Sequence, residues 1–294
     1  MRILAVIVTY KRPPELSKTI DTIKLQGIEE KDILVVNNAR NHSATLELVN
    51  VYKHIQWHHL PENIASAGGF AFGLQKGMEL DYDWIWLFND DSRPKMNCLN
   101  TALPYLSDFT KQGNVGFLKI TERVKENKTV LLFWKGVRVP KYVEISDNPV
   151  ETDLITFDGC FISKNLMEKI GFCDPKFFMG TYEFEYCLRA KDAGFKIYTL
   201  PNGMIEDEKK GAASGTPPWR QYYNTRNHLW LALHRRSLYI FQAWLIRELK
   251  YTYAIILFGN KKGERLLFKY RAIRDAILNR RGKTYHPDNL LTKK

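Results

Sequence analysis

An apolar run from Trp84 to Phe88 ends abruptly at the polar segment Asn89-Asp90-Asp91. A run of this kind predicts a buried strand whose carboxyl end carries two adjacent carboxylates. Neighbouring carboxylates repel each other, and a divalent cation or a cluster of basic side chains is the usual relief. Because open α/β sheets bind ligands at the carboxyl ends of their strands, the segment predicts a ligand site. An exposed turn closed by Pro94 is the alternative interpretation.

Strand and helix patterns alternate on both sides of this run. Apolar runs predict strands at 3–8, 33–36, 55–57 and 84–88, and helical spacing predicts helices at 13–25, 46–51 and 70–80. Later patterns predict strands at 115–120, 130–134, 154–162 and 195–200, a helix at 183–193 and a polar loop at 201–218. The alternation is typical of an α/β fold in which a mostly parallel, Rossmann-like sheet is flanked by helices.

The carboxyl-terminal third is rich in aromatic and basic side chains. The 294-residue chain has a net charge of +12, and its segment 261–294 holds eleven basic residues against three acidic ones. Charged residues interrupt the apolar stretch 238–258, which therefore predicts an amphipathic helix and not a membrane span. We expect a catalytic domain over 1–218 and a basic helical extension over 219–294. This extension would lie on an anionic membrane surface, or pack on the domain or in a homodimer.

The amino terminus does not have the pattern of a secretory leader, because its first apolar run is short and continues into Thr9-Tyr10-Lys11-Arg12. We therefore expect a cytoplasmic protein, with the inner face of the cell membrane as a candidate peripheral location. The cysteines are scattered through apolar surroundings without the spacing of zinc ligands, so neither zinc nor disulfides are required. They are Cys98, Cys160, Cys173 and Cys187.

Polar residues also follow the first two predicted strands. Thr9, Tyr10 and Arg12 follow one strand, and Asn37 ends the next. Neighbouring parallel strands would bring these side chains together in a pocket suited to a base, a ribose and phosphates. Plain turns explain the same residues equally well.

A small-residue segment, Asn63 to Phe70, leads into a predicted helix. The backbone amides of Gly68 and Gly69 could approach an anionic or hydroxylated ligand at the positive end of that helix. A tight turn in which the glycines adopt positive φ is the alternative.

Two acids, Glu183 and Glu185, lie in the first turn of a later predicted helix. Residues two apart cannot share one helical face, so we expect one carboxylate to face a cleft while the other pairs with Arg189. Simple interaction of both acids with the helix dipole is the alternative.

Taken in order, these segments resemble the inverting family-2 glycosyltransferases, and in particular their rhamnosyl- and galactofuranosyltransferase branch. The resemblance extends from Ile3 to about Lys283. The residues that carry it are Val8-Thr9-Tyr10, Asn37-Asn38, Asn63 to Phe70, Asn89-Asp90-Asp91, Gly159, Glu183 to Arg189, Tyr223 and Arg226-Asn227.

The resemblance implies a GT-A fold and a defined reaction. A sugar would pass from a UDP or dTDP sugar to a hydroxyl of a glycan, lipid-linked or protein-linked acceptor, in the synthesis of cell-surface polysaccharide or glycoconjugate. It implies Glu183 as catalytic base, with Glu185 as the second acid of the same motif. It also implies a divalent cation, Mn²⁺ or Mg²⁺.

Carried over position by position, the resemblance implies three groups of binding residues. Donor contacts would come from Thr9, Tyr10, Arg12, Asn37, Asn63, Gly68, Gly69, Asn89 and Asp90. Metal contacts would come from Asp91, Asn89 and Asp207, and acceptor contacts from Gly159 and Tyr182.

The sequence departs from the family pattern at several of these positions. Asn37 and Asn89 stand where many relatives have aspartates, and Asp207 lies where relatives often supply a histidine metal ligand. Tyr182 stands where an acid is common. The alternative function is a basic nucleic-acid-binding protein without catalysis. That alternative explains neither acidic site, so no nucleic-acid partner is expected.

Overall fold

The computed structural model describes residues 1–124, 127–207 and 217–285, with the side chain of Asp207 excepted. The main sheet contains β1 (Ile3–Thr9), β2 (Ile33–Asn37), β3 (Gln56–His59), β4 (Trp84–Asn89), β5 (Ser92–Pro94), β6 (Val115–Glu122), β9 (Val150–Glu151), β10 (Cys160–Ser163) and β11 (Lys196–Asp207). A separate hairpin pairs β7 (Lys128–Trp134) with β8 (Arg138–Glu144). The helices are α1 (Pro13–Lys24), α2 (Ser43–Val51), α3 (Ala65–Glu79), α4 (Cys98–Gln112), α5 (Lys164–Ile170), α6 (Tyr182–Asp192), α7 (Pro218–His234), α8 (Leu238–Phe258) and α9 (Lys262–Ile277).

The strand order in the main sheet is β3-β2-β1-β4-β10-β6-β11-β5, and β9 pairs with β11. The first four of these strands are parallel, whereas β10 is antiparallel to both of its neighbours. The register places Thr9 beside Asn37 and Val8 beside Asn89. The polar ends of β1, β2 and β4 therefore meet at one edge of the sheet. The predicted α/β class with a mostly parallel sheet in its first half is confirmed.

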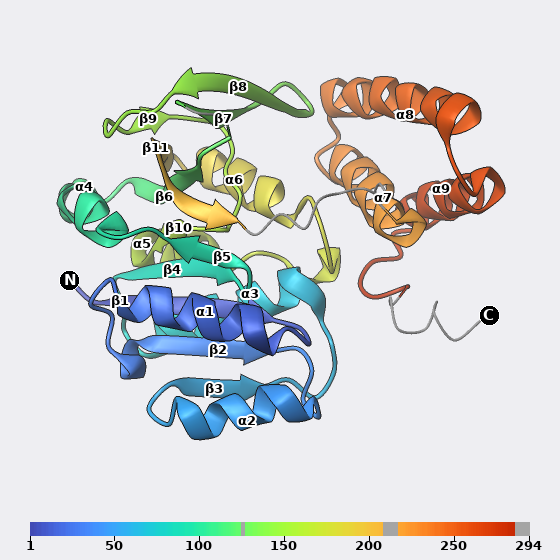
Figure 1. Cartoon of the computed structure of the whole chain (residues 1–294). Helices are drawn as coiled ribbons and strands as arrows, with labels where there is room; N and C mark the ends of the chain where they lie inside the picture. The colour runs from blue at the N-terminus through green and yellow to red at the C-terminus, as the bar shows by residue number, and fades with distance from the viewer. Residues whose placement is uncertain (125–126, 208–216, 286–294) are drawn as a thin grey trace.

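Helices cover both faces of the sheet (Figure 1). Alternate residues of β1 point to opposite faces, because side chains in a strand have a period of two. Leu4, Val6 and Val8 belong to the core cluster that includes α3, α5 and α6. Ile3, Ala5 and Ile7 belong to the cluster that includes α1 and α4.

A stripe of glycines lets α3 approach the sheet closely. A Cβ atom on Gly69 would lie 2.6 Å from Val8 Cγ1, and one on Gly73 would lie 2.4 Å from Val6 Cγ1. One on Gly77 would lie 2.1 Å from Ile85 Cδ1. These separations are too short for non-bonded carbon atoms, so any side chain here would push the helix away from β1 and β4.

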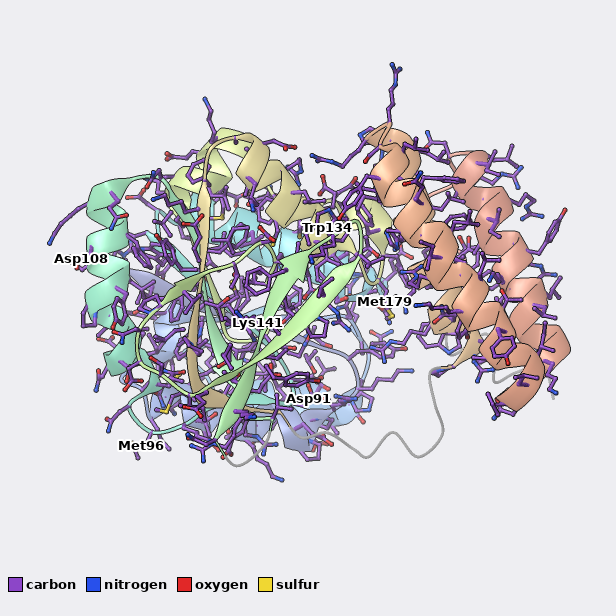
Figure 2. All side chains as sticks on the ribbon, turned by 90° about the horizontal axis from the view of Figure 1, so that it is seen from above. Asp91, Met96, Asp108, Trp134, Lys141 and Met179 are labelled. Carbon is purple, nitrogen blue, oxygen red and sulfur yellow. The ribbon has the colours of Figure 1, made fainter. Side chains whose placement is uncertain are left out.

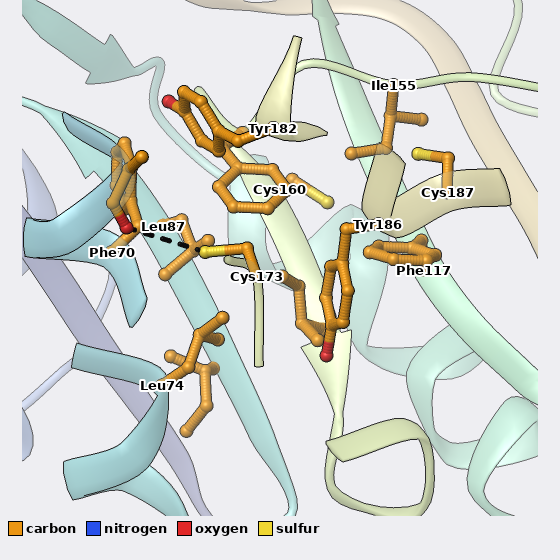
Figure 3. Packing of buried hydrophobic residues seen from close by; sticks show 14 of the residues in the cluster. Phe70, Leu74, Leu87, Phe117, Ile155, Cys160, Cys173, Tyr182, Tyr186 and Cys187 are labelled. Atoms are coloured by element: carbon orange, nitrogen blue, oxygen red, sulfur yellow. Dashed lines mark hydrogen bonds between the residues drawn. The ribbon is translucent and has the colours of Figure 1, made fainter. Parts of the chain in front are cut away.

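Aromatic and sulfur-containing side chains fill the core between α3, α6 and β4 (Figure 3). The rings of Phe70 and Phe157 meet edge to face with centroids 5.4 Å apart, and Phe157 meets Tyr182 in the same way. The thiol of Cys173 donates to the carbonyl of Ala67 at 3.6 Å. This packing fixes the start of α6 against the sheet.

Three predicted boundaries are corrected by the structure. The small-residue segment before position 70 is already helical, since α3 begins at Ala65. The strand predicted at 154–162 is limited to β10, and Leu154 forms only an isolated bridge with Leu132. The loop predicted at 201–218 is strand up to Asp207, because the buried Ile205 still pairs with β5 and β6. Residues 208–216 of that predicted loop lie outside the described residues.

The last three helices stand to one side of the sheet (Figure 1). Asn227 on α7 donates its side-chain amide to the carbonyls of Phe177, Met179 and Gly180, which precede α6. Figure 2 shows Met179 at this junction. Among the helices of the described segments, none is both long and apolar enough to cross a bilayer.

Candidate active site

Asp90 lies at the centre of a hydrogen-bond network at the carboxyl edge of β1 and β4. Its carboxylate accepts hydrogen bonds from Thr9 Oγ1 at 2.8 Å, from the Tyr10 backbone N–H at 3.3 Å and from Arg12 Nη1 at 3.2 Å. Burial raises the pKa of Asp90 to about 6, while Arg12 and Thr9 oppose that rise. Asp90 and Thr9 are both buried, so they hold the ends of β1 and β4 together from behind the site.

Asp91 lies nearer the solvent and forms an ion pair with Arg12. The adjacent Asn89 donates its side-chain amide to Asp158 Oδ1 at 2.5 Å, and its backbone N–H donates to the same oxygen at 2.9 Å. Burial raises the pKa of Asp158, and the nearby Lys119 opposes that rise. Neither Asp158 nor Lys119 was predicted from the sequence, although both lie close to the Asn89-Asp90-Asp91 segment.

A cavity of about 450 Å³ opens at the ends of β1 and β2. Tyr10 and Asn63, both predicted donor contacts, line it, as do Asn38 and Arg40. Lys283 reaches the same cavity from the end of the chain and pairs with Glu62 at 3.0 Å. Amide, phenol and cationic groups in a cavity of this size can bind the base, ribose and phosphates of a nucleotide.

Like Thr9 and Asp90, three further predicted donor contacts do not line this cavity. Asn37 is fully buried, and its side chain accepts from the Ala39 backbone N–H at 2.8 Å and donates to the Ala39 carbonyl at 3.2 Å. Gly68 and Gly69 are buried inside α3, where their small size permits helix packing. Neither glycine has the positive φ that the alternative required. Close packing against Ile64 and Val8 explains these two glycines.

Glu183 lies in the first turn of α6 and lines a second cavity. Its Oε1 accepts a hydrogen bond from the Phe157 backbone N–H at 2.8 Å. Burial raises the pKa of Glu183 to about 7, the hydrogen bond from Phe157 lowers it, and the negative charge of Asp158 raises it further. A carboxylate with this pKa is suited to accept a proton near neutral pH.

Glu185 turns in a different direction from Glu183, as the sequence spacing predicted. It accepts hydrogen bonds from Arg189 Nε at 2.7 Å and Arg189 Nη2 at 3.2 Å. The same guanidinium donates to the carbonyls of Ile170 and Phe172. Glu185 therefore fixes the loop before α6 through Arg189, and its carboxylate is engaged away from the second cavity.

The second cavity, of about 430 Å³, lies between the β7–β8 hairpin, the start of α6 and the carboxyl-terminal helices. Figure 2 shows Trp134 at the end of the hairpin nearest these helices. His228 is a neutral wall residue, because burial lowers its pKa to about 3 and its Nε2–H donates to the Gly136 carbonyl at 2.8 Å. The polar and aromatic lining consists of Trp134, Arg138, Thr181, Glu183, Phe184, Gln221, Asn224, His228 and Arg247.

Most residues that line this cavity were not predicted from the sequence. Its residues come from β7, β8, α6, α7 and α8, which are distant in the chain, and none has a motif of its own. The aromatic and basic composition after Trp219 was the available signal.

Two predicted acceptor contacts, Tyr182 and Gly159, lie in closely packed parts of the fold. Tyr182 is buried in the core against Phe70 and Phe157, so its ring is not presented to the second cavity (Figure 3). Gly159 has a φ of +67°, and a Cβ atom there would lie 2.6 Å from Ile205 Cγ1. Its role is to let the chain turn tightly beside β11.

The oxygen, nitrogen and sulfur atoms of the described side chains show how far this protein could itself ligate a divalent cation. Within residues 1–124, 127–207 and 217–285, no group of three or more His, Cys, Asp or Glu side chains is arranged around a common point. Magnesium beside a diphosphate often uses only one or two carboxylates, with phosphate oxygens and water completing its coordination. The carboxylate of Asp91 fits that limited role. The backbone of Asp207 pairs with Ser92, and its side chain lies outside the described residues.

The two acidic regions are connected through consecutive residues. Asn89, beside Asp90 and Asp91, bonds to the side chain of Asp158, and Glu183 bonds to the backbone of Phe157. The loop that contains Phe157 and Asp158 therefore contacts both the end of β4 and the start of α6.

Known proteins show the same sequence pattern and fold. The dTDP-rhamnosyl transferase RfbF of Shigella flexneri is 26% identical over 240 residues, which cover 76% of this chain and 78% of RfbF. Galactofuranosyltransferase GlfT1 of Mycobacterium tuberculosis (strain CDC 1551 / Oshkosh) is 36% identical over 92 residues, and these make up 30% of each protein.

Solved structures with low sequence identity share the fold. TarS 1–349 of S. aureus in complex with UDP-GlcNAc has a TM-score of 0.60 at 13% identity, covering 94% of this chain and 81% of that one. GalNAc-T7 with UDP, GalNAc and Mn²⁺ has a TM-score of 0.60 at 12% identity, covering 81% of this chain and 51% of that one. The sheet of this protein is therefore a GT-A sheet.

The family model described as Glycosyl transferase family 2 matches residues 4–171, which is more than half of the chain. This match covers most of β1, the Asn89-Asp90-Asp91 segment and the Phe157–Asp158 loop. It gives no support to the alternative of a nucleic-acid-binding protein without catalysis. The protein is a glycosyltransferase and belongs to glycosyl transferase family 2.

Proposed function

We propose that this glycosyltransferase moves a sugar from a nucleotide diphosphate sugar to an acceptor hydroxyl with inversion at the anomeric carbon. Glu183 would take the proton of the attacking hydroxyl, and the nucleoside diphosphate would leave from the opposite face of the sugar. The observation that carries the proposal is the connection of Asn89 and Glu183 through the consecutive residues Phe157 and Asp158. It supports placing the leaving group and the base at two ends of one site.

On the donor side, the nucleotide would occupy the cavity lined by Tyr10, Asn38 and Asn63. Arg12 and Asp91 would lie next to the diphosphate, with Asp91 available to Mn²⁺ or Mg²⁺. A bound cation would offset the charge that develops on the departing diphosphate. The dTDP-rhamnosyl transferase RfbF favours dTDP as the nucleotide, and the GalNAc-T7 and TarS structures, which contain UDP or UDP-GlcNAc, favour UDP.

On the acceptor side, the hydroxyl would enter the cavity that Glu183 shares with Trp134 and Phe184. Aromatic faces suit the apolar side of a sugar ring, and Gln221 and Asn224 can bond to its hydroxyls. We propose an acceptor that is a glycan, lipid-linked or protein-linked, in cell-surface polysaccharide or glycoconjugate synthesis. The division into domains 1–218 and 219–294, and any homodimer, remain predictions.

A nucleotide-sugar screen tests the donor class. We expect a UDP or dTDP sugar with Mn²⁺ to raise the melting temperature by several degrees. Binding to the native state stabilises by about 2.7 kcal/mol when the ligand is near 100 Kd. Differential scanning fluorimetry with and without Mn²⁺ measures this shift, and GDP and ADP sugars are the controls. If no nucleotide sugar shifts the transition in either condition, the proposed function is contradicted.

Lys283 offers a test of the donor cavity. We expect Lys283→Gln to raise the Kd for UDP or dTDP about fivefold, or roughly 1 kcal/mol, because an exposed cation beside a phosphate contributes at this level. The Kd for the corresponding nucleoside should not change. Isothermal titration calorimetry measures both, and Lys261→Gln, at an exposed site on the far helices, is the control. Equal effects on nucleoside and nucleotide would argue against a phosphate contact.

A further inference from the structure

The outer face of α8 is apolar, although it is exposed to solvent. Leu249 is 62% exposed, Tyr253 is 65% exposed and Phe258 is 83% exposed. The helical spacing of Leu249 and Tyr253 places them with Ile246, Ile256 and Leu257 along one side of the helix, and Phe258 is exposed as its last residue. The opposite side is used for packing, since Ile240, Trp244 and Ile255 are buried against the rest of the protein.

An apolar stripe is unusual on the solvent-facing side of a surface helix, which normally carries polar residues. Figure 1 shows α8 at the outer edge of the molecule, above α7 and beside the tip of the β7–β8 hairpin. A large contiguous apolar patch on a water-exposed face is characteristic of an interaction surface. The outer face of α8 therefore fits a partner that can bury apolar side chains.

The charges around the stripe indicate which occupant fits. Residues 235–285 contain thirteen basic and three acidic residues. Two of those acids are buried in ion pairs, Glu248 with Arg247 and Lys269, and Asp275 with Arg274. Lys250 lies on the exposed side of α8, and Lys261 and Lys262 are exposed directly after the helix. The surface around the stripe is therefore strongly positive.

From these observations we infer that α8 docks on an anionic lipid bilayer, with its apolar stripe in the headgroup region and its cations on lipid phosphates. Amphipathic burial and attraction to anionic lipids reinforce each other in such a helix. A second copy of this chain is a poorer occupant, because a two-fold contact through α8 would bring the same cations of both copies together.

Docking through α8 has a consequence for the acceptor, which rests on the proposed function. Arg247 projects from the same helix into the cavity that contains Glu183. A docked α8 would hold that cavity close to the bilayer surface. The acceptor class that fits is then a glycan attached to a membrane lipid, whose sugar end reaches the cavity from the headgroup layer.

Vesicle flotation of the full chain tests the docking directly and requires neither donor nor acceptor. We expect binding to phosphatidylcholine vesicles that contain phosphatidylglycerol, weaker binding at high salt, and little binding to phosphatidylcholine alone. The double variant Ile246→Glu/Leu249→Glu should lower binding by more than about tenfold. The matched control is Leu25→Glu/Val51→Glu, which alters two apolar residues that are 66% and 67% exposed near α1 and α2.

Circular dichroism and a cooperative melting transition without ligand establish that each variant is folded. Equal vesicle binding by the two double variants, or no binding by the wild type, would overturn the docking. So would sedimentation showing a wild-type dimer that the α8 variant dissociates while neither protein floats. A protein that binds vesicles but is stabilised by no nucleotide sugar would contradict the proposed function and leave the docking intact.

Discussion

Glu183→Gln is expected to lower kcat by about 10²- to 10⁴-fold, the contribution that a general base makes to such a reaction. Glutamine keeps the oxygen that accepts the hydrogen bond from the Phe157 backbone N–H, so the start of α6 should hold its position. The amide cannot take the proton of the acceptor hydroxyl. Donor binding, which uses the separate cavity near Tyr10 and Asn63, should therefore be preserved.

The measurement is a transfer assay with a nucleotide sugar found by the melting screen, together with calorimetry of donor binding. Glu168→Gln removes an exposed carboxylate on α5 and is the matched control, for which wild-type rates are expected. Parallel loss of donor affinity and kcat in the Glu183 variant would indicate a structural role. Retention of transfer would exclude Glu183 as the base.

The pH dependence of the wild type follows from the same carboxylate. Burial raises the pKa of Glu183 to about 7, so below that pH the group is protonated and cannot accept a further proton. We expect kcat/KM to increase about tenfold per pH unit up to about pH 7 and then to level off. A rate profile between pH 5 and 9 measures this limb. If kcat/KM instead fell only near the ordinary pKa of a glutamate, a group other than the buried Glu183 would control the reaction.

Arg226→Met is expected to have the largest effect on stability. The guanidinium of Arg226 is fully buried and donates to the Phe177 carbonyl at 3.1 Å and to the Gly282 carbonyl at 2.8 Å. It also lies over the rings of Tyr222 and Tyr223. Methionine fills similar space but donates nothing. The Phe177 carbonyl keeps its hydrogen bond from Asn227, but the buried Asn227 Oδ1 and the Gly282 carbonyl lose the bonds that Arg226 donates. A buried acceptor left without its donor costs about 1–3 kcal/mol.

Removing the buried charge recovers part of that cost, because burial lowers the pKa of Arg226 and so disfavours its charged form. We expect a net loss of about 2–4 kcal/mol in the free energy of unfolding, measured by urea denaturation. The control Arg220→Met lies at an exposed position on the same helix and should change stability by less than about 0.5 kcal/mol.

The same substitution links the carboxyl-terminal segment to the donor cavity. Arg226 holds Gly282, and the neighbouring Lys283 reaches the cavity beside Glu62. Loosening Gly282 should therefore weaken UDP or dTDP binding to about the extent expected for Lys283→Gln. An Arg226 variant with unchanged stability and unchanged nucleotide affinity would contradict this account of the segment.

Local patterns along the chain determined the sheet and the position of its reactive edge. The apolar runs of β1, β2 and β4 each end in polar residues. Because these strands pair in parallel, their polar ends lie together at one edge of the sheet. The spacing of Glu183, Glu185 and Arg189 on one helix also determined that the two acids would separate. These features depend on periodicity over a few residues, which the sequence records directly.

The tertiary structure alone decided which side chains are available at that edge. Asn37, Gly69 and Tyr182 lie within the recognised motifs, yet packing buries them. Lys283, from the segment after α9, and Arg247, from α8, reach the two cavities from distant parts of the chain. Burial also raises the pKa of Glu183, although its place at a helix amino terminus would by itself favour the charged form. Solvent exclusion and contacts between remote segments are properties of the folded chain, and no short stretch of sequence contains them.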